Sequence, residues 1–297
     1  MWRVPEREVG FMLRTVTVGY DGSSESRAAA EWAAREALLR GLPLRLVNVR
    51  EPIPANIAES DLMDDGTYRE RAERLPREAG ATLRGRHPEL EVVAEQIPGG
   101  PMEVLPEVAK DADLLVLGSR GLSGIGGFLV GSVGMVVIAH TTTPVVLVRA
   151  ATSEKTAGPV VVGVDIQKPN GTVLAFAFEE AARRGAVLKA VHGWTVPPYY
   201  AYALPAYPAL AAELGVEQSE ALAEVLRPWR EKFPDVEVAE ESRAGSAAVR
   251  IVDAARDASL VVVGRRIRRS PVGAHIGPVT HAVMHHATAP VAVVAHD

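Results

Sequence analysis

The sequence contains no cysteine, no long apolar run and only a small excess of charge. Without thiols the chain forms neither disulfides nor thiolate metal sites. The longest apolar runs, such as Leu114 to Gly118 and Val145 to Val148, are far shorter than the ~20 residues of a membrane-spanning helix. A net charge of −5 and a pI near 6.0 are unlike the strong basic field of a protein that wraps nucleic acid. We therefore expect a cytoplasmic protein that binds neither membrane nor nucleic acid.

The first residues do not have the composition of a signal peptide. Glu6 and Glu8 stand where such a peptide needs an apolar stretch. We interpret this segment as a loose leader, with Met12 as an alternative initiator.

Internal repetition is the strongest signal in the sequence. Val16 to Asp21 (VTVGYD) returns 144 residues later as Val160 to Asp165 (VVVGVD). Three further pairs follow the same order: Arg40 to Val47 with Arg184 to Val191 at the offset of 144, then Asp113 to Gly118 with Ser259 to Gly264 and Thr143 to Val148 with Ala289 to Val294 at 146. One duplication with a two-residue insertion explains all four pairs. We therefore predict two domains, residues 1–155 and 156–297.

Each copy alternates short β-branched runs with longer segments of helical periodicity. In the first copy the predicted strands are Thr15 to Gly19, Leu44 to Val49, Val92 to Ile97, Leu114 to Gly118 and Val145 to Arg149. The predicted helices are Ser24 to Arg40, about Asp61 to Arg86 with a kink at Pro76, Met102 to Lys110 and Ser132 to His140. This alternation predicts a five-stranded parallel sheet of order 3-2-1-4-5 with helices on both faces, a flavodoxin-like or Rossmann-like α/β fold, in each copy.

A glycine-rich segment follows the fourth predicted strand. It runs from Gly118 through Gly121 to Gly131 and Ser132, with further glycines at 124, 126 and 127. Glycine permits positive φ and lets backbone amides approach an anion without a Cβ in the way. The helix predicted to begin at Ser132 adds the free N–H groups of its first turn. A phosphate-binding loop and an ordinary mobile linker both fit the composition.

The predicted position of this loop favours phosphate binding. In a sheet of order 3-2-1-4-5, ligands bind outside the carboxyl ends of strands one and four. Asp21 ends the first strand, where its carboxylate can accept a hydrogen bond from ribose or base, or cap the next helix. Val47 ends the second strand and offers its backbone to a purine edge, or simply packs in the core.

These residues resemble the universal stress protein family in its tandem form. The resemblance rests on Gly118-x2-Gly121-x9-Gly131-Ser132, on Asp21, and on a final strand that begins at Pro144, and it covers almost the whole chain. It implies flavodoxin-like domains, ATP bound without a Walker lysine, and dimerisation through the last strand. It further implies nucleoside contacts at Asp21, Val47 and Leu117, and phosphate contacts at Gly118, Gly121, Gly131, Ser132 and the amide of Val133.

The second copy departs from this pattern. Ile267 replaces the middle glycine and Pro278 replaces the serine. Proline lacks the N–H that a phosphate would use, although it suits the first turn of a helix. The arginines Arg265, Arg266, Arg268 and Arg269 are interpreted as a solvated loop. The alternatives are an anion site, a contact for the first domain's phosphates and a contact for the acidic face of a regulatory partner. We predict that this domain holds no triphosphate.

Two other features are weaker signals. His281 and His285 lie one helical turn apart, next to His286, but no nearby carboxylate or thiol completes a metal site, so we expect none. The aromatic and proline-rich segment from Pro197 to Pro208 is interpreted as a covering loop, with a lid or partner surface as the alternative.

The sequence therefore favours a cytoplasmic ATP-binding protein of signalling or stress response, with one nucleotide per chain. No residue near the loop supplies a catalytic base, so we expect at most slow hydrolysis, with Mg²⁺ carried on the phosphates. The alternatives are an ATPase or adenylyl-transferring enzyme and a scaffold that binds no nucleotide. The two copies are expected to pair through their last strands into a pseudo-dimer. A homodimer of chains and an unidentified protein partner stay open.

Overall fold

The computed structural model describes residues 14–51, 65–121, 128–150, 157–195, 208–267 and 276–297. The N-terminal half contains β1 (Thr15–Gly19), α1 (Ser24–Arg40), β2 (Leu44–Arg50), α3 (Asp65–Arg86), β3 (Val92–Pro98), α4 (Pro101–Ala109), β4 (Ala112–Gly118), β5 (Arg120–Gly121), β6 (Phe128–Leu129), α5 (Ser132–His140) and β7 (Val145–Val148). The C-terminal half contains β8 (Val160–Gly163), α6 (Gly171–Arg184), β9 (Leu188–Trp194), α8 (Pro208–Lys232), β10 (Val238–Ala244), α9 (Ala247–Ala254), β11 (Leu260–Arg266), α10 (Pro278–His286) and β12 (Val291–His296).

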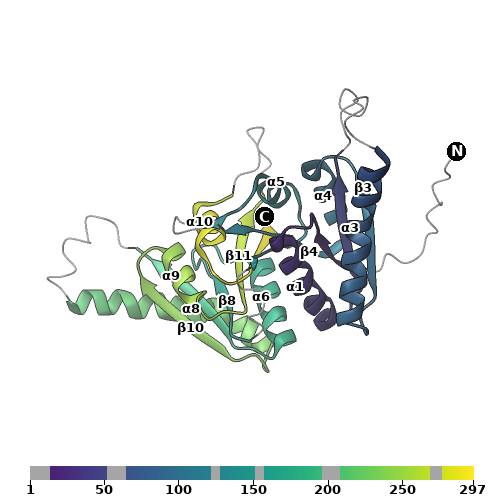
Figure 1. The fold of residues 1–297 in the computed structure, drawn as a ribbon. Coiled ribbons are helices and arrows are strands. Elements are labelled where there is room, and N and C mark those ends of the chain that lie inside the picture. The colour runs from purple at the N-terminus through teal and green to yellow at the C-terminus, as the bar shows by residue number, and fades with distance from the viewer. Residues whose placement is uncertain (1–13, 52–64, 122–127, 151–156, 196–207, 268–275) are drawn as a thin grey trace.

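The two halves share one ten-stranded sheet of order β10-β9-β8-β11-β12-β7-β4-β1-β2-β3 (Figure 1). Within each half every strand pair of this sheet is parallel, and the order is the predicted 3-2-1-4-5. The halves meet at an antiparallel pair of last strands, in which Ala292 lies opposite Val146 and Val293 opposite Val145. The expected pseudo-dimer through the last strands is therefore the arrangement found.

The core forms two apolar layers, one on each face of the sheet. The layer under α1, α3, α6 and α8 includes Val146 and Ala292 of the joined strands. The layer under α4, α5, α9 and α10 includes Val145 and Val293. Because successive residues of a strand point to opposite faces, the joined strands supply both layers, and each layer runs unbroken from one half to the other.

The duplication is also visible in how the equivalent helices end. Both α1 and α6 stop at a glycine in the left-handed region, Gly41 at φ 63° and Gly185 at φ 57°. These glycines are 144 residues apart, the offset of the repeat. Their N-termini differ, because α1 is capped by Ser23 whereas α6 begins one turn later, after Asn170.

Candidate functional site

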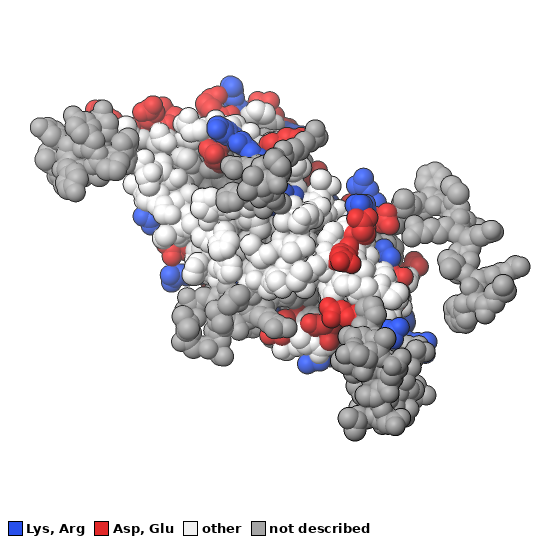
Figure 2. All heavy atoms as spheres, turned by 90° about the horizontal axis from the view of Figure 1, so that it is seen from above, with Lys and Arg blue, Asp and Glu red and all other residues white. Residues whose placement is uncertain are grey.

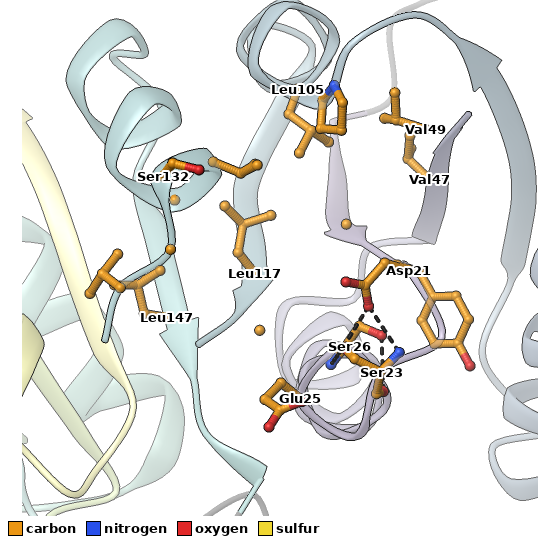
Figure 3. Close-up of a pocket in the computed structure, with 18 residues that line it drawn as sticks. Asp21, Ser23, Glu25, Ser26, Val47, Val49, Leu105, Leu117, Ser132 and Leu147 are labelled. Carbon is orange, nitrogen blue, oxygen red and sulfur yellow. Dashed lines mark hydrogen bonds between the residues drawn. The ribbon is translucent and has the colours of Figure 1, made fainter. Parts of the chain in front are cut away.

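A cavity of about 300 Å³ lies at the carboxyl ends of β1 and β4, where the winding of the sheet reverses. The starts of α1, α4 and α5 complete its walls (Figure 3). Seven of the eight residues predicted for the site line it: Asp21, Val47, Leu117, Gly118, Gly131, Ser132 and Val133. In Figure 3, Asp21 and Ser132 lie on opposite sides of the cavity with Leu117 between them.

The eighth residue, Gly121, lies in a short hairpin. It belongs to β5 and pairs with Phe128 of β6. The described lining of the cavity does not include it. The glycines at 124, 126 and 127 lie outside the described residues.

Asp21 is held by the first turn of α1. Its Oδ1 accepts hydrogen bonds from the Ser23 N–H at 2.9 Å and the Ser23 hydroxyl at 2.5 Å. Ser23 Oγ in turn accepts the Ser26 N–H at 3.1 Å and caps the helix. Burial favours a raised pKa, but the hydrogen bonds from Ser23 outweigh it and lower the pKa of Asp21 below its ordinary value. The site therefore presents a fixed carboxylate at neutral pH, and capping and ligand binding are both open to it.

The N-terminus of α5 faces Asp21 across the cavity. Gly131 is its N-cap and has no side chain to cap it, and the first turn carries no acidic residue. The backbone at Gly131 has φ −61°, which any residue adopts, and a Cβ there would meet no described atom within 4 Å. Neither strain nor packing explains glycine at this position. Glycine instead leaves the space beside the helix end open, whereas a side chain at this position would cover the amides of the first turn.

Gly118 is explained by packing instead. A Cβ at this position would lie 2.6 Å from the Glu25 carbonyl carbon and 2.8 Å from the Ser26 nitrogen. The end of β4 therefore contacts the backbone of α1 directly. The sequence argument invoked positive φ for the loop glycines, but among the described residues neither Gly118 nor Gly131 has it. Of the two reasons given for these glycines, positive φ is therefore wrong for both, whereas the absence of a Cβ beside the helix end still applies to Gly131.

The other end of the cavity is apolar. Val47 is fully buried, and its carbonyl already accepts the Tyr20 N–H at 2.8 Å. Its side chain lines the cavity together with those of Val49 and Leu105 (Figure 3). Sequence reasoning missed Val49 and Leu105. The alternation of β2 placed Val49 on the same face as Val47, and that signal was sufficient to find it.

The C-terminal half has an equivalent cavity of about 520 Å³. Asp165, Gly264 and Gly277 line it at the positions of Asp21, Gly118 and Gly131. Pro278 opens α10, as predicted, and removes one donor. Ile267, which replaces the middle glycine, has no positive φ, and its N–H donates to the His296 carbonyl at 2.6 Å.

The arginine run proved to be divided between two environments. Arg265 and Arg266 are the last residues of β11, not a loop. Arg265 is buried, and its Nη2 donates to the Thr141 carbonyl at the end of α5 in the other half, at 2.7 Å. Arg266 is exposed and lines the second cavity. The interpretation of the run as a solvated loop is therefore wrong for Arg265, and residues 268 and 269 lie outside the described residues.

A reciprocal contact comes from Arg149, which directly follows β7. It is buried, and its Nη2 donates to the Met284 carbonyl in the last turn of α10 at 2.5 Å. Burial lowers the pKa of both Arg149 and Arg265. Each half therefore sends one arginine to the C-terminal end of the other half's helix, where a cation complements the helix dipole.

The remaining sequence features are the histidines of α10, the hydropathy of the helices, the surface charge and the aromatic segment. The rings of His281 and His285 lie 4.4 Å apart, centre to centre, but no group of three or more metal-ligating side chains occurs there. None of the described helices is long and apolar enough to cross a bilayer. On the face shown in Figure 2, acidic and basic side chains are interspersed around a largely uncharged centre. Residues 197–207 of the aromatic segment lie outside the described residues.

Comparison with known proteins gives consistent matches for both halves. The model of the universal stress protein family matches residues 12–149 and 157–295. A universal stress protein of Mycobacterium tuberculosis is 34% identical over 293 residues, covering 94% of this chain and 96% of the relative. Another from that organism is 31% identical over 301 residues, covering 94% of each. The crystal structure of a universal stress protein from Archaeoglobus fulgidus covers 97% of this chain and 100% of its own, with 19% identity and a TM-score of 0.69.

Proposed function

Since the chain belongs to the universal stress protein family, we propose that its N-terminal domain binds ATP in the 300 Å³ cavity and acts in the cytoplasm as a nucleotide-dependent regulator of signalling or stress response. The observation that carries the proposal is the N-terminus of α5, whose N-cap is Gly131 and whose first turn lines this cavity opposite Asp21.

The phosphates are assigned to the α5 end. The amides of Ser132, Val133 and Gly134 have no intrahelical partner in an α-helix, and all three residues line the cavity. Ser132 adds a hydroxyl, and the first turn contributes the positive end of the helix dipole. We also assign phosphate contacts to Gly118 and Gly121. Gly118 belongs to the described lining of the cavity, and Gly121 lies in the neighbouring hairpin.

The nucleoside is assigned to the opposite end. The buried side chains of Val47, Leu105 and Leu117 form an apolar wall for a purine face. Asp21 lies beside it with a lowered pKa and is suited to accept hydrogen bonds from ribose hydroxyls. A cavity of this size is at the lower end of the range for small-molecule sites, about 300–1,000 Å³.

The negative charge of the cavity lining favours binding of ATP together with Mg²⁺. The described lining contains the carboxylates of Asp21 and Glu25 and no lysine or arginine. Backbone amides and the Ser132 hydroxyl, without a cationic side chain in the described lining, must then face a triphosphate close to two like charges. A Mg²⁺ ion carried on the phosphates would offset this charge without a dedicated protein cage.

We propose that the site binds without efficient catalysis. The two carboxylates are on the side of β1 and α1, away from the α5 end, and phosphoryl transfer needs a group that positions the nucleophile at the phosphate. The enzyme alternative, an ATPase or adenylyl-transferring activity, predicts sustained turnover. The scaffold alternative predicts no nucleotide in the purified protein.

The experiment compares Gly131→Val with Gly277→Val, its equivalent in the second domain. Both positions have φ −61°, and a Cβ added at either would meet no described atom within 4 Å, so both variants should fold. We expect Gly131→Val to abolish ATP binding in titration calorimetry with Mg²⁺, because the side chain covers the end of α5. Gly277→Val should bind as the unmodified protein does. Unchanged affinity in Gly131→Val would refute the assignment.

A further inference from the structure

A cluster of six charged side chains lies where α1 of the N-terminal domain meets α6 of the C-terminal domain (Figure 1). At its centre are Glu36 and Glu180, whose side chains are each 1% exposed. Arg40 contacts Glu36 at 2.7 Å and Glu180 at 2.5 Å, and Arg184 contacts both carboxylates as well. Every one of these four residues therefore has a partner in the other domain.

This central tetrad is symmetric. Glu180 and Arg184 are the repeat equivalents of Glu36 and Arg40, each at the offset of 144. Each arginine joins the glutamate of its own helix to the glutamate of the other helix. A tetrad of this kind would form equally well between two N-terminal domains or between two C-terminal domains, so it does not by itself select a partner.

Two further members break the symmetry. Asp113 contacts Arg40 at 2.5 Å, and its equivalent in the C-terminal domain is the uncharged Ser259. Arg183 contacts Glu180 at 2.5 Å, and its equivalent in the N-terminal domain is Leu39. The N-terminal domain thus contributes two carboxylates and one guanidinium, whereas the C-terminal domain contributes one carboxylate and two guanidiniums. Their sum is neutral only when one domain of each kind is present.

Burial makes this balance matter. Buried ion pairs tolerate neither a missing partner nor a surplus charge, because the low dielectric strengthens every uncompensated interaction. Burial raises the pKa of Glu180, and the nearby carboxylate of Glu36 raises it further. The guanidinium of Arg183 acts in the opposite direction and favours the charged form of Glu180. Arg14 also contacts Asp113, but at 3.5 Å and with its side chain 77% exposed, so water screens that charge.

We propose that this cluster selects the pairing partner: an N-terminal domain accepts a C-terminal domain, of its own chain or of a second copy, and rejects another N-terminal domain. Two N-terminal domains would bring together two surplus negative charges, and two C-terminal domains two surplus positive charges, on side chains that are mostly withdrawn from water, since Asp113 is 23% and Arg183 27% exposed. The backbone of the last strands cannot make this distinction, because both are short apolar strands that pair antiparallel. Any dimer of chains through these strands must then form by exchange of unlike domains.

The first test cuts the folded chain at a protease site placed between residues 151 and 156. Mixed ¹⁵N-labelled and unlabelled cut protein is unfolded in urea, refolded, and analysed by native mass spectrometry, with scrambling of the label as the sign that the halves exchanged. A random mixture contains unlike and like pairs in equal number, and we expect the ratio of unlike to like pairs to be at least about ten, a factor that corresponds to about 1.4 kcal/mol per pair. Like pairs at the random frequency would overturn the proposal.

The matched control substitutes each odd charge by its repeat equivalent, Asp113→Ser together with Arg183→Leu. Both halves of this variant carry one carboxylate and one guanidinium, so we expect its halves to approach the random mixture of pairs. Retention of the full preference for unlike pairs in the double variant would show that the charges are not the selector, and would equally overturn the proposal.

A second measurement uses the intact chain and does not require the halves to refold separately. Each single variant leaves one surplus charge in the cluster, whereas the double variant is neutral. The double variant should therefore lose less stability in urea unfolding than the two single variants lose together. Strict additivity would mean that Asp113 and Arg183 act only on their own neighbours, and the proposal would fail.

Discussion

Substitution of Gly118 tests whether the first cavity is built on direct contact between β4 and α1. An alanine Cβ at Gly118 would lie 2.6 Å from the Glu25 carbonyl carbon and 2.8 Å from the Glu25 oxygen and Ser26 nitrogen. These are backbone atoms of a capped helix, so they cannot rotate away. Overpacking costs about 1–3 kcal/mol, and the restriction of the unfolded chain returns about 0.4–1 kcal/mol. We therefore expect Gly118→Ala to lower the free energy of unfolding by about 1–2 kcal/mol.

The matched control is Gly264→Ala in the second domain. A Cβ there meets the side chains of His296, at 2.8 Å, and Val173, at 3.0 Å, which can move. Thermal unfolding without nucleotide should lower the midpoint by roughly 2–8 °C for Gly118→Ala, at about 2–4 °C per kcal/mol for domains of this size, and by less for Gly264→Ala. Gly118→Ala should also weaken ATP binding, because movement of α1 displaces Ser23 from Asp21. Equal midpoints for the two variants would refute the reasoning.

Three further predictions concern stoichiometry, the joined strands and pH. Calorimetric titration should give close to one ATP per chain, because Pro278 removes a donor from the second site; a value near two would show that Arg266 and its neighbours compensate. Charged substitutions at Val146 and Val293 together should separate the domains and increase the scattering radius, since both side chains are buried at the joined strands; an unchanged radius would contradict this. The pKa of Asp21 is lowered on folding, so its stabilising contribution is present above its unfolded value of about 4 and is lost as the pH falls through the folded value. Asp21→Asn should therefore be less stable than the unmodified protein at pH 5–8, by a difference that shrinks in acid; urea midpoints across pH would show a constant difference if Asp21 is not responsible.

The sequence was most informative about the fold, because repetition and periodicity are local properties. The helices predicted at Ser24–Arg40 and Ser132–His140 and the strand at Thr15–Gly19 have these bounds in the structure. The other elements of the first copy differ mainly at their ends, as with β4, which begins at Ala112. Ends depend on pairing with neighbouring strands, which periodicity does not report.

The site could be predicted in position but not in its physical detail. Motif spacing brought Asp21 and Gly131 to the same cavity. It did not show that Gly118 serves contact with α1, because the approach of two segments 92 residues apart is a property of the packed fold. For the same reason the sequence grouped Arg265 with its neighbours in a charged run. The strand β11 places it in the interior, whereas Arg266 points to the second cavity.

The antiparallel joint between β7 and β12 has a consequence for how the two cavities are presented. Ligands of such sheets approach the carboxyl ends of the strands, and these ends point in opposite directions in the two domains. The two cavities therefore open at opposite ends of the joined strands, and the described linings of the two share no residue. One link between them is α5, whose first turn lines the first cavity while the carbonyl at its C-terminal end receives Arg265, the neighbour of Arg266 in the second. The reciprocal link is α10, whose first turn lines the second cavity while its Met284 carbonyl receives Arg149 of the N-terminal half. A partner protein docked over one cavity would thus contact the other through these two helices.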